Sequence, residues 1–260
     1  MFQYPNIDPV AFALGPLQVH WYGLMYVLGF VAGWFGLRAR SRRADSPVAP
    51  ARVEDLIFYI AIGVFVGGRV GYMLIYDWGS LVDDPLRLFY VWRGGMSFHG
   101  GLIGVLLMMA LFAKRTGQTF FAITDFLAPW VPPALGFVRI GNFINGELWG
   151  AETSADAPWS VVFEGVPRHP TQLYEAFLEG LVMLVVLVWF SARPRPRMAV
   201  SGLFLLLYGV FRFGVEFIRL PDAHIGYEAF GWVTRGQILT APMIVAGIML
   251  LVLAYRRRDA

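Results

Sequence analysis

A group of polar residues stands within an otherwise apolar part of the chain. Residues 137–150 read FVRIGNFINGELWG, and Arg139, Asn142, Asn145 and Glu147 bring charge and amide groups into this stretch. A cation at the depth of the hydrocarbon layer is costly, and such a residue usually faces a charged partner or a polar cavity. We therefore expect this segment to form a site for a lipid headgroup, although the two asparagines could also join neighbouring helices.

Two residues from other parts of the chain could complete the chemistry of this site. Arg212 interrupts another apolar stretch, and two guanidinium groups can hold a phosphodiester through paired hydrogen bonds. His99 stands between two glycine pairs, and an imidazole with an ordinary pKa near ~6.5 suits a general base. Two alternatives remain open. Each arginine could pair with a buried glutamate, and a lone histidine is more often a satisfied core residue.

Several other polar residues have both a functional and a structural interpretation. Tyr22 could bind a headgroup or belong to an interfacial aromatic belt. For Arg69, a role in helix packing and a role in the site are equally favoured. Glu216 lies four residues after Arg212 and three before Arg219, so these three side chains can form a ladder of ion pairs on one helix face.

The composition excludes several kinds of site. The chain has no cysteine, so it has no disulfide, no thiolate metal ligand and no cysteine nucleophile. Its four histidines are scattered without the spacing of a zinc site, and no glycine motif for nucleoside phosphates or dinucleotides occurs. We expect no metal, no cofactor and no nucleic-acid partner.

The elements that must position these residues are membrane helices. Of the 260 residues, 57% are hydrophobic and only 15% are charged, which is typical of an integral membrane protein. The pattern predicts an all-α, polytopic membrane protein, a single transmembrane domain over residues 1–260 with a small periplasmic head at 147–170. Its seven predicted transmembrane helices are 17–37, 56–76, 96–113, 120–145, 171–192, 198–218 and 237–255.

The distribution of basic residues predicts the orientation of these spans. Thirteen lysines and arginines follow the odd-numbered spans and five lie in the opposite loops. Positive residues favour the cytoplasmic side, so we expect the N-terminus outside the cytoplasm and the C-terminus inside it. A rise of ~1.5 Å per residue then brings the unusual polar residues of several spans close to the outer surface. They are Tyr22, His99, Arg139, Glu147, Glu175, Arg212 and Glu216.

Six segments, in order along nearly the whole chain, resemble bacterial prolipoprotein diacylglyceryl transferases. The most specific is RIGNFINGELWG at 139–150. The others are HWYGLMY at 20–26, GGRVGY at 67–72, GGMSFHGG at 94–101, RHPTQLYE at 168–175 and FRFGVEFIRLPD at 211–222. One departure is Val138, where that family usually has glycine, and it could alter helix packing beside Arg139.

The resemblance implies an enzyme of lipoprotein maturation. Such enzymes transfer the diacylglyceryl group of phosphatidylglycerol to the lipobox cysteine of a prolipoprotein and release glycerol phosphate. The expected partners are therefore phosphatidylglycerol, membrane lipid and the prolipoprotein signal peptide. The family's essential histidine and arginines correspond to His99, Arg139 and Arg212. Its other implicated positions correspond to Tyr22, Asn142, Glu147, Gly150, Glu216 and Arg219, and Asn145 joins them as an expected substrate-binding residue.

Two functions of other classes are compatible with the same residues. A transporter or flippase for an anionic lipid could use the arginines as a binding site. A structural or assembly protein could contain them as buried ion pairs. The enzyme is favoured because the polar groups lie at one outer level and none lines a path to the cytoplasm.

Overall fold

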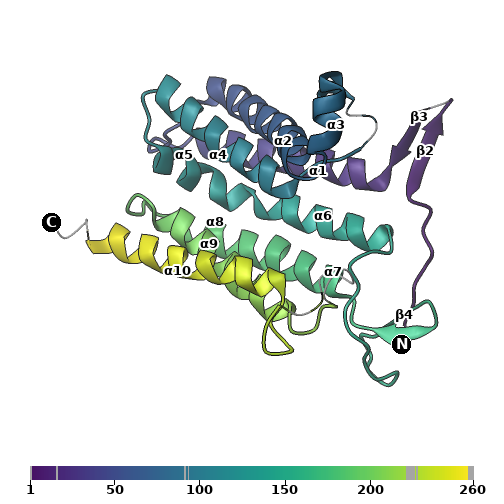
Figure 1. Ribbon diagram of the computed structural model, residues 1–260. Coiled ribbons are helices and arrows are strands. Elements are labelled where there is room, and N and C mark those ends of the chain that lie inside the picture. Colours follow the sequence, from purple (N-terminus) through teal and green to yellow (C-terminus); the bar gives the residue numbers. More distant parts are fainter. Residues whose placement is uncertain are drawn as a thin grey trace. The chain divides into compact units, whose positions relative to one another are not determined.

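The computed structural model describes residues 2–15, 17–90, 92, 94–220, 226 and 228–256. It is mainly helical (Figure 1) and divides by its internal contacts into two compact units. The first unit comprises Met1–Gly36 and Leu127–Ala260, and the second comprises Leu37–Phe126. The prediction of one membrane domain over the whole chain stays a prediction. Some residues used in the sequence arguments lie outside the described part: Arg93, Pro221, Asp222, His224, Arg257 and Arg258.

The N-terminus folds differently from the predicted first span. Strands β1 (Phe2–Gln3), β2 (Val10–Leu14) and β3 (Leu17–His20) precede helix α1 (Trp21–Ser41). β2 and β3 form an antiparallel hairpin, and Gly15 between them has a φ of +62°, which glycine adopts without strain. The prediction that a span begins at residue 17 is therefore wrong, because residues 17–20 pair with β2 and the helix begins at Trp21.

The second unit is held together by close packing of two helices. α2 and α4 approach each other through glycines, and a Cβ atom built on Gly67 would lie 2.4 Å from the carbonyl oxygen of Gly100. Gly63 and Gly104 continue the contact one turn further on, since residues four apart share one face of a helix. The elements of this unit after α1 are η1 (Pro50–Arg52), α2 (Val53–Ile75), α3 (Trp78–Asp83), η2 (Pro85–Phe89), α4 (Phe98–Arg115) and α5 (Phe120–Leu127).

The first unit contains the remaining helices. They are η4 (Ala128–Trp130), α6 (Pro132–Ile144), α7 (Thr171–Glu175), the π-helix η5 (Ala176–Val182), α8 (Met183–Phe190), α9 (Ala199–Val215) and α10 (Arg235–Arg256). Ala128, Met183, Leu187 and Val200 form a buried apolar cluster that joins η4, α8 and α9. This cluster packs α8 against α9. The segment before α8 carries Glu179, and α9 carries Arg212 near its end.

A small sheet forms within the predicted head. Strands β4 (Val161–Phe163) and β5 (Val166–Arg168) make a hairpin, and Glu164 and Gly165 in its turn both have positive φ, as a tight two-residue hairpin requires. β1 pairs in parallel with the other edge of β4, so the N-terminal residues also belong to this sheet. Its periplasmic location stays a prediction.

Four helical segments of the described chain are long and apolar enough to cross a membrane: Pro50–Ile75, Phe98–Arg115, Thr171–Phe190 and Arg235–Arg256. Phe120–Trp130 and Pro132–Ile144 pass the same test together, with a bend of 47° at the break, and make a fifth span if they are one. Proline explains the break, since it removes a helical hydrogen bond. The 17-residue α9 is apolar but shorter, so the count of seven spans stays a prediction.

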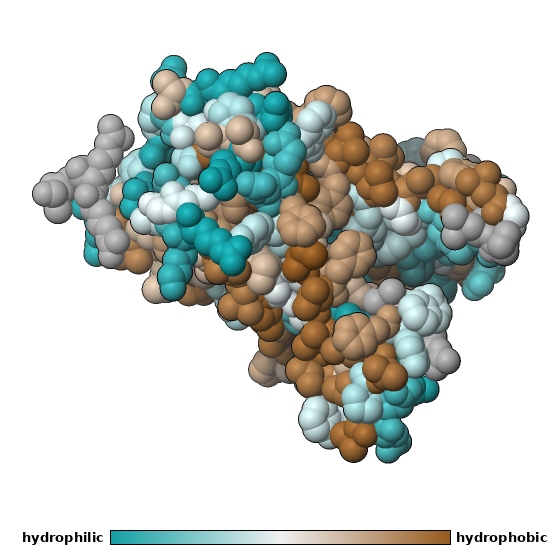
Figure 2. Space-filling model, turned by 90° about the horizontal axis from the view of Figure 1, so that it is seen from above, coloured by the Kyte–Doolittle hydropathy of each residue, from teal (hydrophilic) through white to brown (hydrophobic). Residues whose placement is uncertain are grey.

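The exterior of these helices is apolar, as a lipid-facing surface must be. Only 17–28% of the residues in the most hydropathic part of each of the four segments are buried within the protein. Large side chains such as Phe65, Leu107 and Trp189 are exposed, and brown apolar atoms cover much of the face in Figure 2. Exposed apolar surface on this scale indicates a polytopic membrane protein.

Candidate active site

A close contact between two glycines brings α6 against the helix that starts at α7. A Cβ atom built on Gly136 would lie 3.0 Å from the Cα atom of Gly180, so a larger residue at either position would push the helices apart. Arg139 follows Gly136 by about one turn, and Glu179 directly precedes Gly180. The glycine contact therefore places a guanidinium group of α6 against a carboxylate of the π-helix η5.

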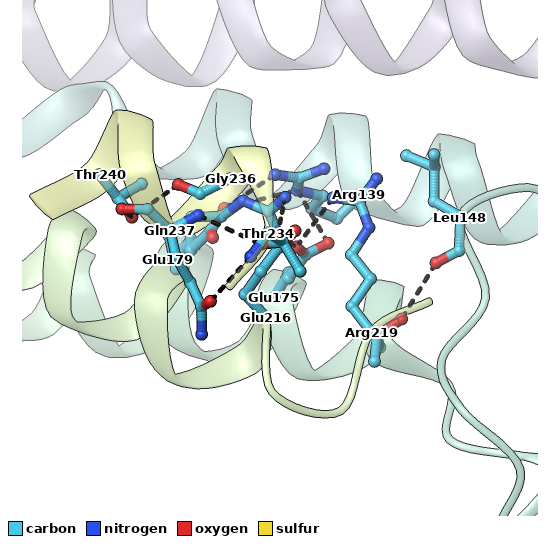
Figure 3. Close-up of polar contacts among 12 residues, drawn as sticks. Arg139, Leu148, Glu175, Glu179, Glu216, Arg219, Thr234, Gly236, Gln237 and Thr240 are labelled. Carbon is cyan, nitrogen blue, oxygen red and sulfur yellow. Dashed lines mark hydrogen bonds and ion pairs between the residues drawn. The ribbon is translucent and has the colours of Figure 1, made fainter. Parts of the chain in front are cut away.

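Arg139 forms ion pairs with two glutamates (Figure 3). Its Nε atom lies 3.2 Å from Oε2 of Glu175, and its Nη2 atom lies 3.4 Å from Oε2 of Glu179. Both glutamates lie four residues apart in an apolar helix, so they share one face. The alternative of a buried glutamate partner is confirmed for this arginine.

Arg212 and Arg219 converge on the same carboxylate. Arg212 is near the end of α9, and its Nη1 atom donates a hydrogen bond to Oε1 of Glu175. Its Nη2 atom lies 2.7 Å from Oε2 of Glu216, which confirms the expected ion pair at a four-residue spacing. Nη1 of Arg219 lies 3.9 Å from Oε1 of Glu175. Three arginines therefore surround one buried glutamate.

The acids of this cluster are more deeply buried than the arginines. The side chains of Glu175 and Glu179 have no exposed surface, whereas those of Arg139, Arg212 and Arg219 retain 15%, 11% and 10%. The carboxylates thus contact the guanidinium groups on their buried side and leave the other side partly exposed. Within the described residues, Nη1 of Arg139 has no recorded hydrogen bond, so it can donate to an incoming anion.

Sequence reasoning did not assign a role to Glu175 or Glu179, yet both belong to the site. Two glutamates on one face of an otherwise apolar span were the available signal. Their segment passes from α7 into a π-helix, a feature that often occurs at functional sites.

A second polar group forms where α6 ends. The side-chain amides of Asn142 and Asn145 donate hydrogen bonds of 2.8 and 3.3 Å to the same oxygen, Oε1 of Glu147. Gly146 has a φ of +67°, which reverses the chain and returns Glu147 towards the helix. Tyr22 of α1 lies beside Asn142 and Glu147, so the structure brings these four predicted residues together.

Gly150 contributes through its backbone rather than through a side chain. Its N–H donates to the carbonyl oxygen of His169 (2.9 Å), and it forms a β-bridge with Arg219. A Cβ atom at Gly150 would lie 2.6 Å from that carbonyl oxygen and 2.7 Å from Thr171. The absence of a side chain therefore allows Gly150 to lie directly against His169 and Thr171 while its backbone pairs with Arg219.

A Gly150→Ala variant is expected to lose about 1–3 kcal/mol of unfolding free energy through overpacking, and to lose activity because Arg219 shifts. Thermal unfolding in detergent and transfer activity measure the two effects. Gly214→Ala is the matched control, since nothing lies within 4 Å of a Cβ atom there. A Gly150→Ala protein as stable and active as the control would contradict this account.

His99 lies in the second unit, at the second position of α4, and its side chain is exposed. Ser97 fixes the start of this helix. Its N–H donates to the carbonyl oxygen of Gly68 (2.9 Å), and its hydroxyl oxygen accepts a hydrogen bond from the N–H of Gly100 (3.2 Å). Ser97 is thus a helix cap, and the approach of His99 to the arginines stays a prediction.

The side chain of Arg69 binds backbone carbonyl groups and so has a structural role. Its guanidinium group is buried and donates to the carbonyl oxygens of Leu88 and Gly95, each at 3.1 Å. It also donates to the carbonyl oxygens of Arg87, Tyr90 and Gly94. These bonds fasten the segment that precedes Ser97 to α2. The packing interpretation therefore accounts for Arg69.

Replacing Arg69 with lysine is expected to loosen residues 87–90, 94 and 95, because one ammonium group cannot reach five carbonyl oxygens. Loss of hydrogen bonds to a charged donor costs about 1.5–3 kcal/mol each, so amide exchange there should accelerate at least about tenfold. Hydrogen–deuterium exchange followed by mass spectrometry measures this. Arg52→Lys, at an exposed ion pair with Asp55, should leave exchange unchanged. Equal exchange in the Arg69 variant and the wild type would refute the assignment.

The chain is similar to known proteins over its whole length. The family model described as prolipoprotein diacylglyceryl transferase matches residues 9–253. A phosphatidylglycerol–prolipoprotein diacylglyceryl transferase of Methylococcus capsulatus is 61% identical over 264 aligned residues, which cover 100% of both chains. Proteins of the same name from Oleidesulfovibrio alaskensis and Pseudomonas aeruginosa strain PAO1 are 57% and 53% identical. They cover 96% and 100% of this chain, and 94% and 98% of their own.

Both kinds of similarity extend across the arginine cluster, the Asn142–Glu147 group and His99. The resemblance inferred from the sequence motifs is thereby confirmed. The chain belongs to the prolipoprotein diacylglyceryl transferase family.

Proposed function

We propose that this protein transfers the diacylglyceryl group of phosphatidylglycerol to the lipobox cysteine of prolipoproteins, the first step of lipoprotein maturation. Its full-length similarity to enzymes of that name is the observation that carries the proposal. The convergence of three arginines on one buried glutamate supports it, because it supplies oriented donors for a lipid phosphate.

Arg139 and Arg212 bind the phosphodiester. Their buried glutamate partners fix the guanidinium planes, so little side-chain freedom is lost when the lipid binds. Negative charge grows on the leaving phosphate during the reaction. Oriented cationic donors in a site of low dielectric stabilise that charge, and one such donor typically contributes about 3–4 kcal/mol.

His99 acts as the general base. The substrate thiol has an ordinary pKa near ~8.5, so it is mainly protonated at neutral pH and needs a base. Its proton passes to His99 as the sulfur bonds to the glycerol carbon that carries the phosphate. The bond between that carbon and the phosphate oxygen breaks, and glycerol phosphate leaves with the electron pair.

The group at the end of α6 orients the glycerol headgroup. Both asparagines donate to Oε1 of Glu147, and Oε2 has no recorded hydrogen bond among the described residues. That oxygen can accept from a hydroxyl group of the phosphatidylglycerol headgroup, and Tyr22 is near enough to Glu147 to interact with it electrostatically. Gly150, Glu216 and Arg219 shape the binding site from the side of the head.

The reaction takes place at the periplasmic side of the bacterial inner membrane. The distribution of basic residues supports this location, because with seven spans, an outer N-terminus and a cytoplasmic C-terminus the arginine cluster and the head lie on the periplasmic side. The lipid and the signal peptide both reside in the membrane, so they reach the site laterally between helices.

Incubation of the purified protein with phosphatidylglycerol and a lipobox peptide tests the function. Mass spectrometry is expected to show a diacylglyceryl thioether on the cysteine and free glycerol phosphate. A cysteine-to-serine peptide is the control. Binding or movement of the lipid without thioether formation would contradict the proposal and favour a transporter.

An Arg212→Lys variant is expected to lose activity by about 10–100-fold, because a single ammonium group cannot hold Glu175, Glu216 and a phosphate together. The value of kcat/KM in the thioether assay measures the loss. Arg38→Lys is the control, since Arg38 forms a partly exposed ion pair with Glu54. Full activity of the Arg212 variant would show that a point charge suffices.

A further inference from the structure

A cavity of about 930 Å³ lies beside the candidate headgroup site, between the N-terminal segment and the head hairpin. β1 and β4 run together as far as the hydrogen bond from the N–H of Tyr4 to the carbonyl oxygen of Val162 (3.1 Å). Beyond it the two segments diverge. Residues 6–9 form one wall of the cavity, 162–165 form the other, and 144–146 at the end of α6 form its base.

The walls of this cavity are held in place. The hydroxyl group of Tyr4 donates a 2.8 Å hydrogen bond to the carbonyl oxygen of Ile144, which ties the N-terminal segment to α6. Its ring packs edge-on against Phe143, Trp149 and Phe163, with centroids 5.3–5.6 Å apart. Such pairs contribute beyond their buried area, so the cavity is a built feature of the first unit.

The cavity has the charge and size of a site for polypeptide rather than for a phosphate. Of the described residues that line it, Asp8 and Glu164 carry carboxylates, and none is a lysine or an arginine. An anionic headgroup would be repelled. Its volume is near the upper end of the ~300–1,000 Å³ found for drug-sized ligands, which exceeds what a glycerol headgroup needs.

Asn145 connects the cavity to the reaction site. It lines the cavity and also donates to Glu147 in the predicted headgroup site. Its side-chain oxygen is buried and has no hydrogen-bond partner in the described part of the chain, so an acceptor remains for a ligand N–H. A ligand in this cavity would therefore be in contact with a residue of the candidate site.

We propose that this cavity binds the polypeptide segment that follows the lipobox cysteine of the prolipoprotein, and selects neutral or basic residues there. The inference rests on the proposed transfer function. That segment continues from the modified cysteine out of the membrane, in extended form, and supplies backbone N–H groups for Asn145 and the cavity walls. Asp8 and Glu164 attract basic side chains and disfavour acidic ones.

Peptides with one signal segment and lipobox but different following residues test the selection. Three lysines after the cysteine should give a kcat/KM about three- to tenfold above that for three glutamates at low salt, because the carboxylates are exposed and screened. The Asp8→Asn/Glu164→Gln variant should process both peptides at nearly equal rates.

A second double variant tests whether negative charge elsewhere on the head could produce the same preference. Glu152→Gln/Asp156→Asn removes the same charge from exposed head residues that do not line the cavity, and it should keep the wild-type preference. An equal preference in the wild type and the Asp8/Glu164 variant would overturn the inference about the cavity and leave the proposed function unaffected. Failure to modify any peptide would instead refute the proposed function.

Photocrosslinking locates the segment without depending on turnover. A peptide with a benzophenone side chain three residues after the cysteine, mixed with the full protein in phosphatidylglycerol nanodiscs, should label residues 3–9 or 162–165. Labelling confined to other segments would overturn the inference, as would labelling of these segments by a headgroup-photoreactive phosphatidylglycerol.

Discussion

A His99→Gln protein is expected to fold normally and to lose transfer activity by about 10²–10⁴-fold, the usual contribution of a general base. The side chain of His99 is exposed at the start of α4, so its replacement removes little packing. Ser97 caps the helix independently of His99. Replacing His99 should therefore lower the activity and leave the stability unchanged.

Single-turnover kinetics and thermal unfolding in the same detergent measure the two properties of the His99→Gln variant. His20→Gln is the control, since His20 is also exposed but ends a strand in the other unit. It should keep both properties. A His99→Gln protein with wild-type turnover would assign proton removal to another group, whereas an unfolded one would assign His99 a structural role.

The sequence predicted that Arg139 and Arg212, on different helices, lie close together, and both contact Glu175. Arg139 and Arg212 each interrupt an apolar stretch, and the cost of an unpaired cation in hydrocarbon predicts a charged partner or a polar cavity for each. The spacing of Arg212 and Glu216 predicted their ion pair, which the structure confirms at 2.7 Å. Local spacing within one helix is reliable in this way because helix geometry fixes it.

The contacts between helices could not be predicted from spacing. Arg139 reaches the glutamates because Gly136 meets Gly180, and neither glycine reveals its partner in the sequence. The strand at residues 17–20 was missed for a related reason. Its apolar residues continue the hydrophobic run of α1, and only pairing with β2 distinguishes strand from helix there.

Arg69 shows how a buried arginine can have a purely structural contact set. Its recorded hydrogen bonds are all to backbone carbonyl oxygens, whereas Arg139 and Arg212 contact carboxylates at a partly exposed edge. A sequence contains both kinds of arginine in the same apolar setting. The distinction depends on residues 87–90, 94 and 95, whose return to α2 no local pattern specifies.

A Glu175→Gln variant is expected to lose about 3 kcal/mol of unfolding free energy and most of its activity. Removing one member of a buried ion pair leaves its partner uncompensated, and three arginines contact this carboxylate. For a chain of this size, the loss should lower the melting temperature by about 6–12 °C. Glu54→Gln, at a half-exposed pair with Arg38, should lower it by no more than about 4 °C.

The same variant tests whether the cluster binds phosphate. With Glu175 neutral, Arg139, Arg212 and Arg219 face one carboxylate fewer, and a phosphodiester can supply the missing negative charge. Phosphatidylglycerol should therefore raise the melting temperature of Glu175→Gln more than that of the wild type, while uncharged diacylglycerol raises neither. Equal shifts in both proteins would mean that the lipid phosphate binds elsewhere, and that the arginines serve only to neutralise the buried acids.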